Sequence, residues 1–101
     1  MMAKQRQLNL LGLAMRSRNL VSGDELVEQA IKKSQVALVC CASDASAKTR
    51  ERYIELAKRH KIVCNLSFNR QEISQAIGRK RTICGITNRG MVKTFLSYEK
   101  E

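Results

Sequence analysis

The run from Val36 to Ala42 is the most apolar stretch of the chain, and it constrains the fold more than any other feature. It includes two β-branched residues and ends at the turn-forming pair Ser43 and Asp44, which is typical of a strand rather than a helix. Because successive side chains of a strand point to opposite faces of its sheet, a run that is apolar throughout must be buried on both faces. We therefore predict a central strand over 36–42 with helices packed above and below it.

The remaining segments alternate between helical and extended patterns. Helices are predicted over 4–17, from 24 onward, over 48–60, over 69–77 and after Asn88, and further strands over 19–23, 62–66 and 82–87. The chain has no internal repeat, low-complexity segment or linker, and its 101 residues suit one domain. The alternation predicts a single domain over 1–101, an α/β fold with three layers in the order α/β/α.

Local signals give details of two predicted helices. Ser22 and Glu25 have the spacing of a capping box, which places a helix start at Asp24. The apolar side chains expected on the buried faces are Leu26, Val27, Ala30 and Ile31 in this helix, and Tyr53, Ile54, Leu56 and Ala57 in the helix over 48–60.

Positive charge is concentrated in two parts of the sequence. The formal net charge is +10, and residues 1–23 and 76–98 contain Lys and Arg but no Asp or Glu. If the chain ends and the loop over 78–82 meet in space, they form a basic face able to neutralise phosphates. A solubilising surface or binding to acidic membrane lipid would also account for this charge.

Few residue patterns suggest catalysis or metal binding. The four cysteines form no C-x-x-C pair and lie in apolar segments, so buried thiols in a reducing cytosol are expected. The sequence has one histidine, His60, and neither a G-x-G-x-x-G motif nor a P-loop. No apolar run approaches the roughly 20 residues of a membrane helix. We predict a cytoplasmic protein that needs no metal or cofactor and is not an enzyme; a small α/β enzyme is the less favoured alternative.

Three groups of residues resemble a known family: Leu20–Leu26 with Ala30–Lys32, Val36–Val39 with Ala42–Ala45, and Ile73 with Ala76–Gly78. They resemble the kink-turn RNA-binding family of ribosomal proteins L7Ae and L30e, and most of all its small bacterial YlxQ-type members. The resemblance implies an α/β/α sandwich with a mixed four-stranded sheet. It also implies an RNA site made by the start of the second helix, the loop after the central strand and the loop before the last strand.

The resemblance implies a set of RNA-binding residues in and around these segments. They are Gly23, Asp24, Glu25, Gln29, Asp44, Ala45, Gly78, Arg79, Lys80, Arg81 and Thr82. We include Arg18, Asn19 and Ser22 in the predicted site as well. The strongest binders of the family continue from the glycine as G-x-N-E-x-x-K, whereas this chain has Glu25, Leu26 and Gln29 at the last three places. We expect recognition of RNA shape and phosphates more than of bases. Glu25 is either a base-reading carboxylate or the capping partner of Ser22.

The functional prediction follows from the charge and from the resemblance. We expect a monomeric protein that binds structured, kink-turn-like RNA, such as ribosomal RNA, in a ribosome or another ribonucleoprotein. The alternative is a basic protein-interaction module without base preference.

Overall fold

The computed structural model describes residues 2–100, in which helices and strands alternate as predicted. The helices are α1 (Met2–Arg16), α2 (Asp24–Lys32), α3 (Ala47–Arg59), α4 (Arg70–Ile77) and α5 (Arg89–Ser97), and the short 3₁₀ helix η1 (Tyr98–Lys100) follows α5. The strands are β1 (Leu20–Ser22), β2 (Leu38–Cys41), β3 (Val63–Asn65) and β4 (Ile83–Ile86).

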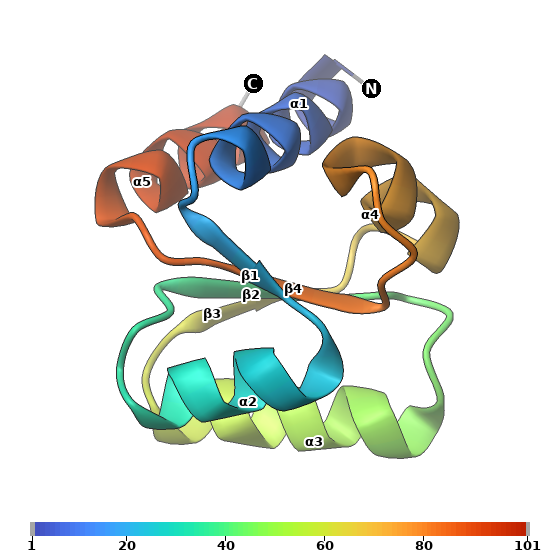
Figure 1. The fold of residues 1–101 in the computed structure, drawn as a ribbon, viewed down its shortest axis with the longest axis vertical. Helices are drawn as coiled ribbons and strands as arrows, with labels where there is room; N and C mark the ends of the chain where they lie inside the picture. The colour runs from blue at the N-terminus through green and yellow to red at the C-terminus, as the bar shows by residue number, and fades with distance from the viewer. Residues whose placement is uncertain (1, 101) are drawn as a thin grey trace.

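The four strands form one mixed sheet in the order β1-β4-β2-β3. β4 is antiparallel to both β1 and β2, whereas β2 and β3 are parallel. Helices α1, α4 and α5 cover one face of the sheet, and α2 and α3 cover the other (Figure 1). The predicted three-layer α/β/α architecture is confirmed.

The apolar run over 36–42 lies at the centre of this sandwich. Its regular strand pairing, in β2, spans only 38–41. The hydrogen bonding continues at both ends, because the Ala37 N–H donates to the Ile86 carbonyl and the Ala42 N–H donates to the Thr82 carbonyl, at 2.9 Å each. Val36 and all residues over 38–42 are buried. The prediction that both faces are covered is therefore confirmed.

Two predicted core positions are wrong. Leu26 of α2 is 63% exposed and Ile54 of α3 is 43% exposed. Each directly adjoins a fully buried residue, Val27 or Tyr53, and successive residues of a helix are about 100° apart around its axis. The stripe that faces the sheet is therefore narrower than the apolar residues of the sequence suggested.

The predicted capping box at α2 is also wrong. The helix does begin at Asp24, but Ser22 is the last residue of β1 and Gly23 is the N-cap, with no side-chain hydrogen bond. A capping box forms instead at α4. There the Asn69 side chain accepts the Glu72 N–H at 2.8 Å, and Glu72 accepts the Asn69 N–H at 3.0 Å.

Helices α1, α2 and α3 end in the same way at one end of the sheet. Each is followed by a non-glycine residue with positive φ: Arg18 at 63°, Ser34 at 59° and Lys61 at 58°. The next N–H then bonds to the carbonyl five residues back: Asn19 to Ala14 at 2.7 Å, Gln35 to Ala30 at 2.9 Å and Ile62 to Ala57 at 2.9 Å. These are Schellman turns, which satisfy the last carbonyls of each helix.

The described residues contain no group of three side chains suited to holding a metal ion. Cys40, Cys41 and Cys84 are buried free thiols, and burial raises the pKa of Cys41 to about 11. Such thiols are poor nucleophiles and poor ligands. Within 2–100, none of the helices combines the length and apolar character needed to cross a bilayer.

Candidate nucleic-acid interface

Three loops meet at the end of the sheet where α2 begins, on the right of Figure 1. They are the turn at Gly23, the segment over 42–46 after β2 and the segment over 78–82 before β4. The Gly23 N–H donates to the Ile83 carbonyl at 2.9 Å, and the Ala42 N–H donates to the Thr82 carbonyl at 2.9 Å. The start of β4 therefore joins the two loops on either side of it.

A cavity of about 330 Å³ opens between these loops. Its lining includes Gly23, Ala45, Lys80 and Arg81, which the sequence predicted as site residues. It also includes Arg70, the first residue of α4, which sequence reasoning missed. Nothing in the sequence near Arg70 marks it, because only the fold brings it next to residues 23 and 80. Three cationic side chains thus converge on one cavity.

Arg81 is held in place by several hydrogen bonds. Its backbone N–H donates to the Ser74 hydroxyl at 3.0 Å, and that hydroxyl lies 3.1 Å from the Arg81 carbonyl. Its Nε donates to the Ser22 hydroxyl at 3.3 Å, and one terminal nitrogen donates to the Lys80 carbonyl at 2.9 Å. The guanidinium is fixed at the cavity with further N–H groups free for a ligand, because arginine has five donors.

Gly23 has a conformational reason to be glycine. Its φ is 98°, a region that side chains rarely adopt, and a Cβ built there would lie 3.7 Å from Nε of Arg81. Its carbonyl accepts the first hydrogen bond of α2, from Val27, while the N–H groups of the first helical turn point out of the helix end. Free N–H groups at a helix start favour anions.

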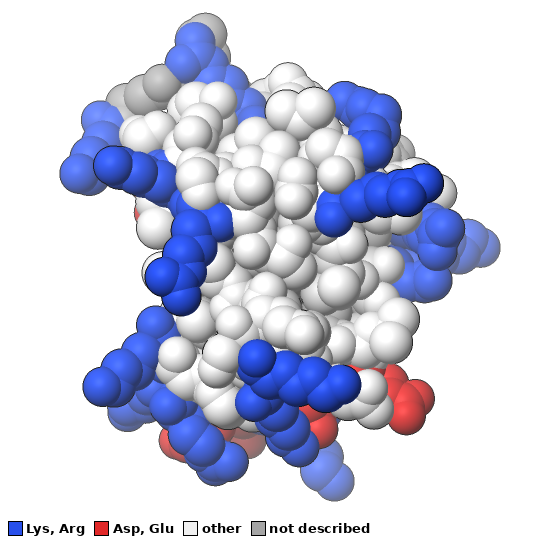
Figure 2. Space-filling view, turned by 60° about the vertical axis from the view of Figure 1, so that its left-hand side comes forward, with Lys and Arg blue, Asp and Glu red and all other residues white. Residues whose placement is uncertain are grey.

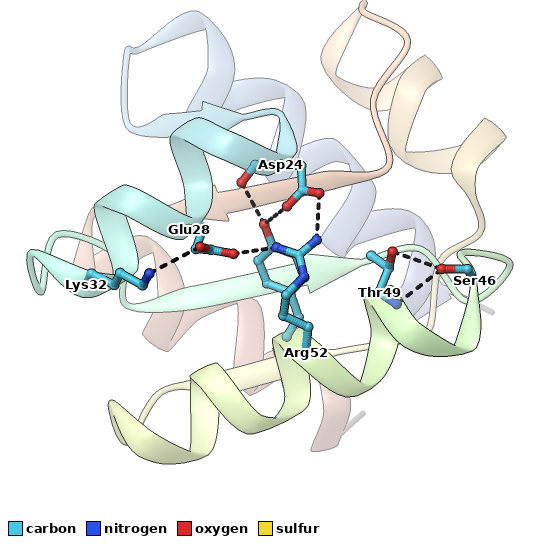
Figure 3. A network of polar contacts seen from close by, with 7 residues as sticks. Asp24, Glu28, Lys32, Ser46, Thr49 and Arg52 are labelled. Atoms are coloured by element: carbon cyan, nitrogen blue, oxygen red, sulfur yellow. Dashed lines mark hydrogen bonds and ion pairs between the residues drawn. The ribbon is translucent and has the colours of Figure 1, made fainter.

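Asp24 and Glu28 of α2 are bound by α3 (Figure 3). Arg52 contacts both carboxylates, with one terminal nitrogen 2.6 Å from Asp24 Oδ2 and the other on Glu28. The Tyr53 hydroxyl lies 2.5 Å from Asp24 Oδ1. The hydrogen bonds from Arg52 hold the pKa of both carboxyl groups below their ordinary values. Asp24 therefore serves to fasten α2 to α3, and its carboxylate is already occupied.

Glu25 and Gln29 lie on the outer side of α2 and are exposed, as is Leu26 between them. Within 2–100, Glu25 has no hydrogen bond or ion pair, so the capping role considered for it is absent. Glu25 and Gln29 line a shallow groove that adjoins the cavity at Asp24. A carboxylate and an amide are thus presented beside the cationic cavity.

The predicted residues of the 42–46 and 78–82 loops differ in what they expose. Asp44 accepts the Arg70 N–H at 2.8 Å and so ties its loop to α4, and the Ala45 side chain is buried. Arg79 and Lys80 are exposed. Gly78 ends α4 with φ 76°.

Arg18 and Asn19 lie apart from the other predicted site residues. Leu20 pairs with Ile86, the last residue of β4, and the Asn19 carbonyl accepts the Thr87 N–H at 2.9 Å. Arg18 and Asn19 therefore lie at the end of the sheet where β4 ends. The three residues of β1 separate Asn19 from Gly23, and these four steps along an extended strand span about 13 Å at the usual rise. The structure therefore does not bring these two residues to the cavity at Gly23.

The basic character extends beyond this cavity. Helices α1, α4 and α5, which include most of the two acid-free segments, pack in one layer. Figure 2 shows Lys and Arg around the side of the molecule that is on the left in Figure 1, with acidic side chains mainly along its lower edge. The positive charge thus surrounds this part of the surface and is not confined to one patch.

Comparison with known proteins finds a matching family and relatives of similar length. Residues 5–95 match the model of the Ribosomal protein L7Ae/L30e/S12e/Gadd45 family. The RNA-binding protein YlxQ of Enterococcus faecium is 34% identical over 90 residues, which cover 89% of this chain and 87% of the relative. The RNA-binding protein YlxQ of Bacillus subtilis strain 168 is 30% identical over 89 residues, covering 87% and 89%.

Solved structures of similar fold include two informative cases. A protein of unknown function from Bacillus halodurans C superposes with a TM-score of 0.88 at 33% identity, over 94% of this chain and 97% of the other. The Giardia lamblia 15.5kD RNA binding protein gives a TM-score of 0.83 at 11% identity, over 99% and 90%. At that identity the second likeness shows the fold alone.

Proposed function

The chain belongs to the ribosomal protein L7Ae/L30e/S12e/Gadd45 family, and from this premise we propose that it binds structured, kink-turn-like RNA through the surface around Gly23. The observation that carries the proposal is the convergence of Arg70, Lys80 and Arg81 on the cavity beside Gly23. Two relatives that match most of this chain are named as RNA-binding proteins, which supports the same class of ligand.

The geometry suits phosphates. Lys80 supplies a compact ammonium charge, and Arg70 supplies a guanidinium that can donate two parallel hydrogen bonds. Arg81 is fixed by its hydrogen bonds to Ser22 and Ser74. The N-terminus of α2, which is the positive end of the helix dipole, points to the same place. A sharp bend in an RNA duplex brings phosphates of its two arms closer together than a straight duplex does. A compact group of cations therefore favours a bent RNA over a straight one.

Base contacts would come from the outer side of α2. Exposed guanine N–H groups are donors, and the unpaired Glu25 carboxylate accepts only. Gln29, one turn further along, can donate or accept. Leu26 offers neither, so base reading in this protein rests on Glu25 and Gln29, and phosphate and shape recognition contribute the larger part.

We include in the proposal that the protein acts as one RNA-binding domain over 1–101, as a monomer in the cytoplasm, on ribosomal RNA or another ribonucleoprotein RNA. The family is non-enzymatic, in agreement with the prediction made from the sequence.

The test is binding of a kink-turn RNA and of a matched straight duplex, measured by fluorescence anisotropy at fixed salt. We expect the parent to prefer the kink turn. The triple variant Arg79→Ala, Lys80→Ala, Arg81→Ala should bind both RNAs more weakly, since phosphate contacts are shared by all sequences. A matched control removes three exposed bases from α3, Lys48, Lys58 and Arg59, and should retain the preference.

Equal affinity of the parent for both RNAs, with full competition by unrelated RNA, would contradict the proposal. It would favour a basic module without base preference. Unchanged binding by the triple variant would show that the loop over 79–81 only solubilises the protein.

A further inference from the structure

A second cavity lies at the opposite end of the sheet, where α1, α2 and α3 end and α5 begins, on the left of Figure 1. Its volume is about 380 Å³, within the range of small-ligand sites. Ile31, Val36, Ile62 and Val92 give it an apolar floor. Figure 2 views this side of the molecule and shows uncharged surface bordered by Lys and Arg.

The rim of this cavity is polar and cationic. His60, Lys61 and Arg89 line it together with Ser34 and Thr87. None of its lining residues, all of which belong to the described part of the chain, is Asp or Glu. The segments that meet here, 14–20, 29–37, 56–62 and 86–93, contain no acidic residue in the sequence either.

The exposed cations at this end are more than the helix dipoles need to be balanced. Three helix C-termini and one N-terminus meet at this end, which together amount to about one negative charge. The Schellman turns already satisfy the last helical carbonyls through backbone N–H groups. The exposed cations at this end are Arg18, Lys33, Arg59, Lys61 and Arg89. Their combined charge exceeds what the dipoles can balance, so this end attracts anions.

Cavity and rim together fit one nucleotide of a single strand. The apolar floor can cover the face of a base, and His60 supplies a ring at its edge; stacking on such rings is a common way to hold unpaired bases. Lys61 and Arg89 lie where they can contact the adjoining phosphate. A protein or lipid partner would use the charge but has no need of a nucleotide-sized hollow.

We propose that this cavity is a second RNA-binding site, which takes a nucleotide of a single-stranded segment through Lys61, Arg89 and His60. The proposal is independent of the kink-turn preference, since the two sites lie at opposite ends of a molecule that measures 29 × 26 × 25 Å. One protein could then hold a folded RNA element at the Gly23 end and a flanking single strand at the other.

The test uses a labelled single-stranded hexaribonucleotide, which cannot form a kink turn. Lys61→Gln with Arg89→Gln should weaken its binding several-fold and reduce the slope of log K against log salt by about 0.7 per residue removed, the value for a single strand. The control Lys100→Gln, an exposed base of η1, should change neither quantity. Circular dichroism checks that the variants remain folded, and each single substitution should give about half of the effect on the slope.

Competition separates this site from the first. Excess kink-turn RNA should leave the hexamer bound, and the triple variant at 79–81 should bind the hexamer like the parent. The inference is overturned if the Lys61 and Arg89 variant binds the hexamer as tightly as the parent, or if kink-turn RNA displaces it completely. Displacement by equimolar AMP would overturn the assignment to an RNA strand and indicate a free nucleotide. If the parent shows no preference for kink-turn RNA while its binding of the hexamer still depends on Lys61 and Arg89, only the proposed function is contradicted.

Discussion

Arg52 is the residue that joins the two helices beneath the sheet. It contacts Asp24 and Glu28 of α2 from α3, and its guanidinium stacks over the Tyr53 ring at 4.9 Å. The arrangement positions the first turn of α2, from which Gly23 and Glu25 reach the proposed RNA surface. A polar network on the solvent side of two helices thus determines where the interface residues lie.

This network makes stability depend on pH. The pKa values of Asp24 and Glu28 lie below their ordinary values of 3.8 and 4.5 in the folded protein, so both carboxylates stabilise the fold above these values. That contribution is lost as the pH falls through the lowered folded pKa values. Arg52→Gln should therefore reduce the free energy of unfolding more at pH 7 than at pH 3, as measured by urea denaturation. The same substitution at Arg59 of α3 is the control, and an equal loss at both pH values for Arg52→Gln would contradict this explanation.

Glu25 is the residue for which the structure changes the prediction most. Because Gly23 is the cap and Glu25 has no partner within 2–100, Glu25→Gln should leave stability nearly unchanged. It should weaken kink-turn RNA relative to straight duplex by about 1–3 kcal/mol, since a charged acceptor is lost. Paired titrations of both RNAs measure the difference, with Glu55→Gln on α3 as the control. A variant that keeps the full preference would exclude Glu25 from base reading.

At the scale of helices and strands, the residues with positive φ lie next to the ends of helices. Gly78 ends α4 in the left-handed region, and a Cβ there would meet nothing within 4 Å. At the ends of α1, α2 and α3 the equivalent positions hold Arg18, Ser34 and Lys61 instead of glycine. Glycine at position 78 therefore avoids the backbone strain of a positive φ, whereas Arg18, Ser34 and Lys61 adopt a positive φ in spite of that strain.

Substitutions at these positions should have opposite signs. Gly78→Ala places a side chain in the left-handed region without a clash, so it should lower the free energy of unfolding by about 1 kcal/mol. Ser34→Gly relieves the same strain and should raise stability by a smaller amount, because glycine gains freedom in the unfolded chain. Urea unfolding midpoints give both values. A Gly78→Ala variant as stable as the parent would show that backbone strain is not the reason for glycine there.

Helices and strands could be predicted from the sequence where a single local property, such as an unbroken apolar run or a capping residue, determined the structure. The run over 36–42 had to be buried on both faces, and Asn69, Gly78 and Asn88 mark helix ends by their own chemistry. The capping box at Ser22 could not be predicted correctly, because the pairing of β1 with β4 keeps Ser22 in a strand. Leu26 likewise has apolar chemistry but faces outward.

At the scale of the whole molecule, the two ends of the sheet differ in how much the sequence revealed. Gly23, Ala45 and Arg81 were predicted as one site and do lie around one cavity. The sequence could not place Arg70 beside this cavity or Arg18 at the opposite end of the sheet, since both positions depend on the order and direction of the strands. That order, with β4 between β1 and β2, follows from long-range pairing that no local pattern encodes.

The central claim is that structured RNA binds at the Gly23 end. The most direct measurement is an amide NMR titration of the full chain with one equivalent of a short kink-turn RNA. We predict that the amide resonances of Gly23, Ala45 and Arg81 shift most, while those of Lys61 and Arg89 at the opposite end stay close to their free positions. Shifts confined to the opposite end, or none at either end, would contradict the claim.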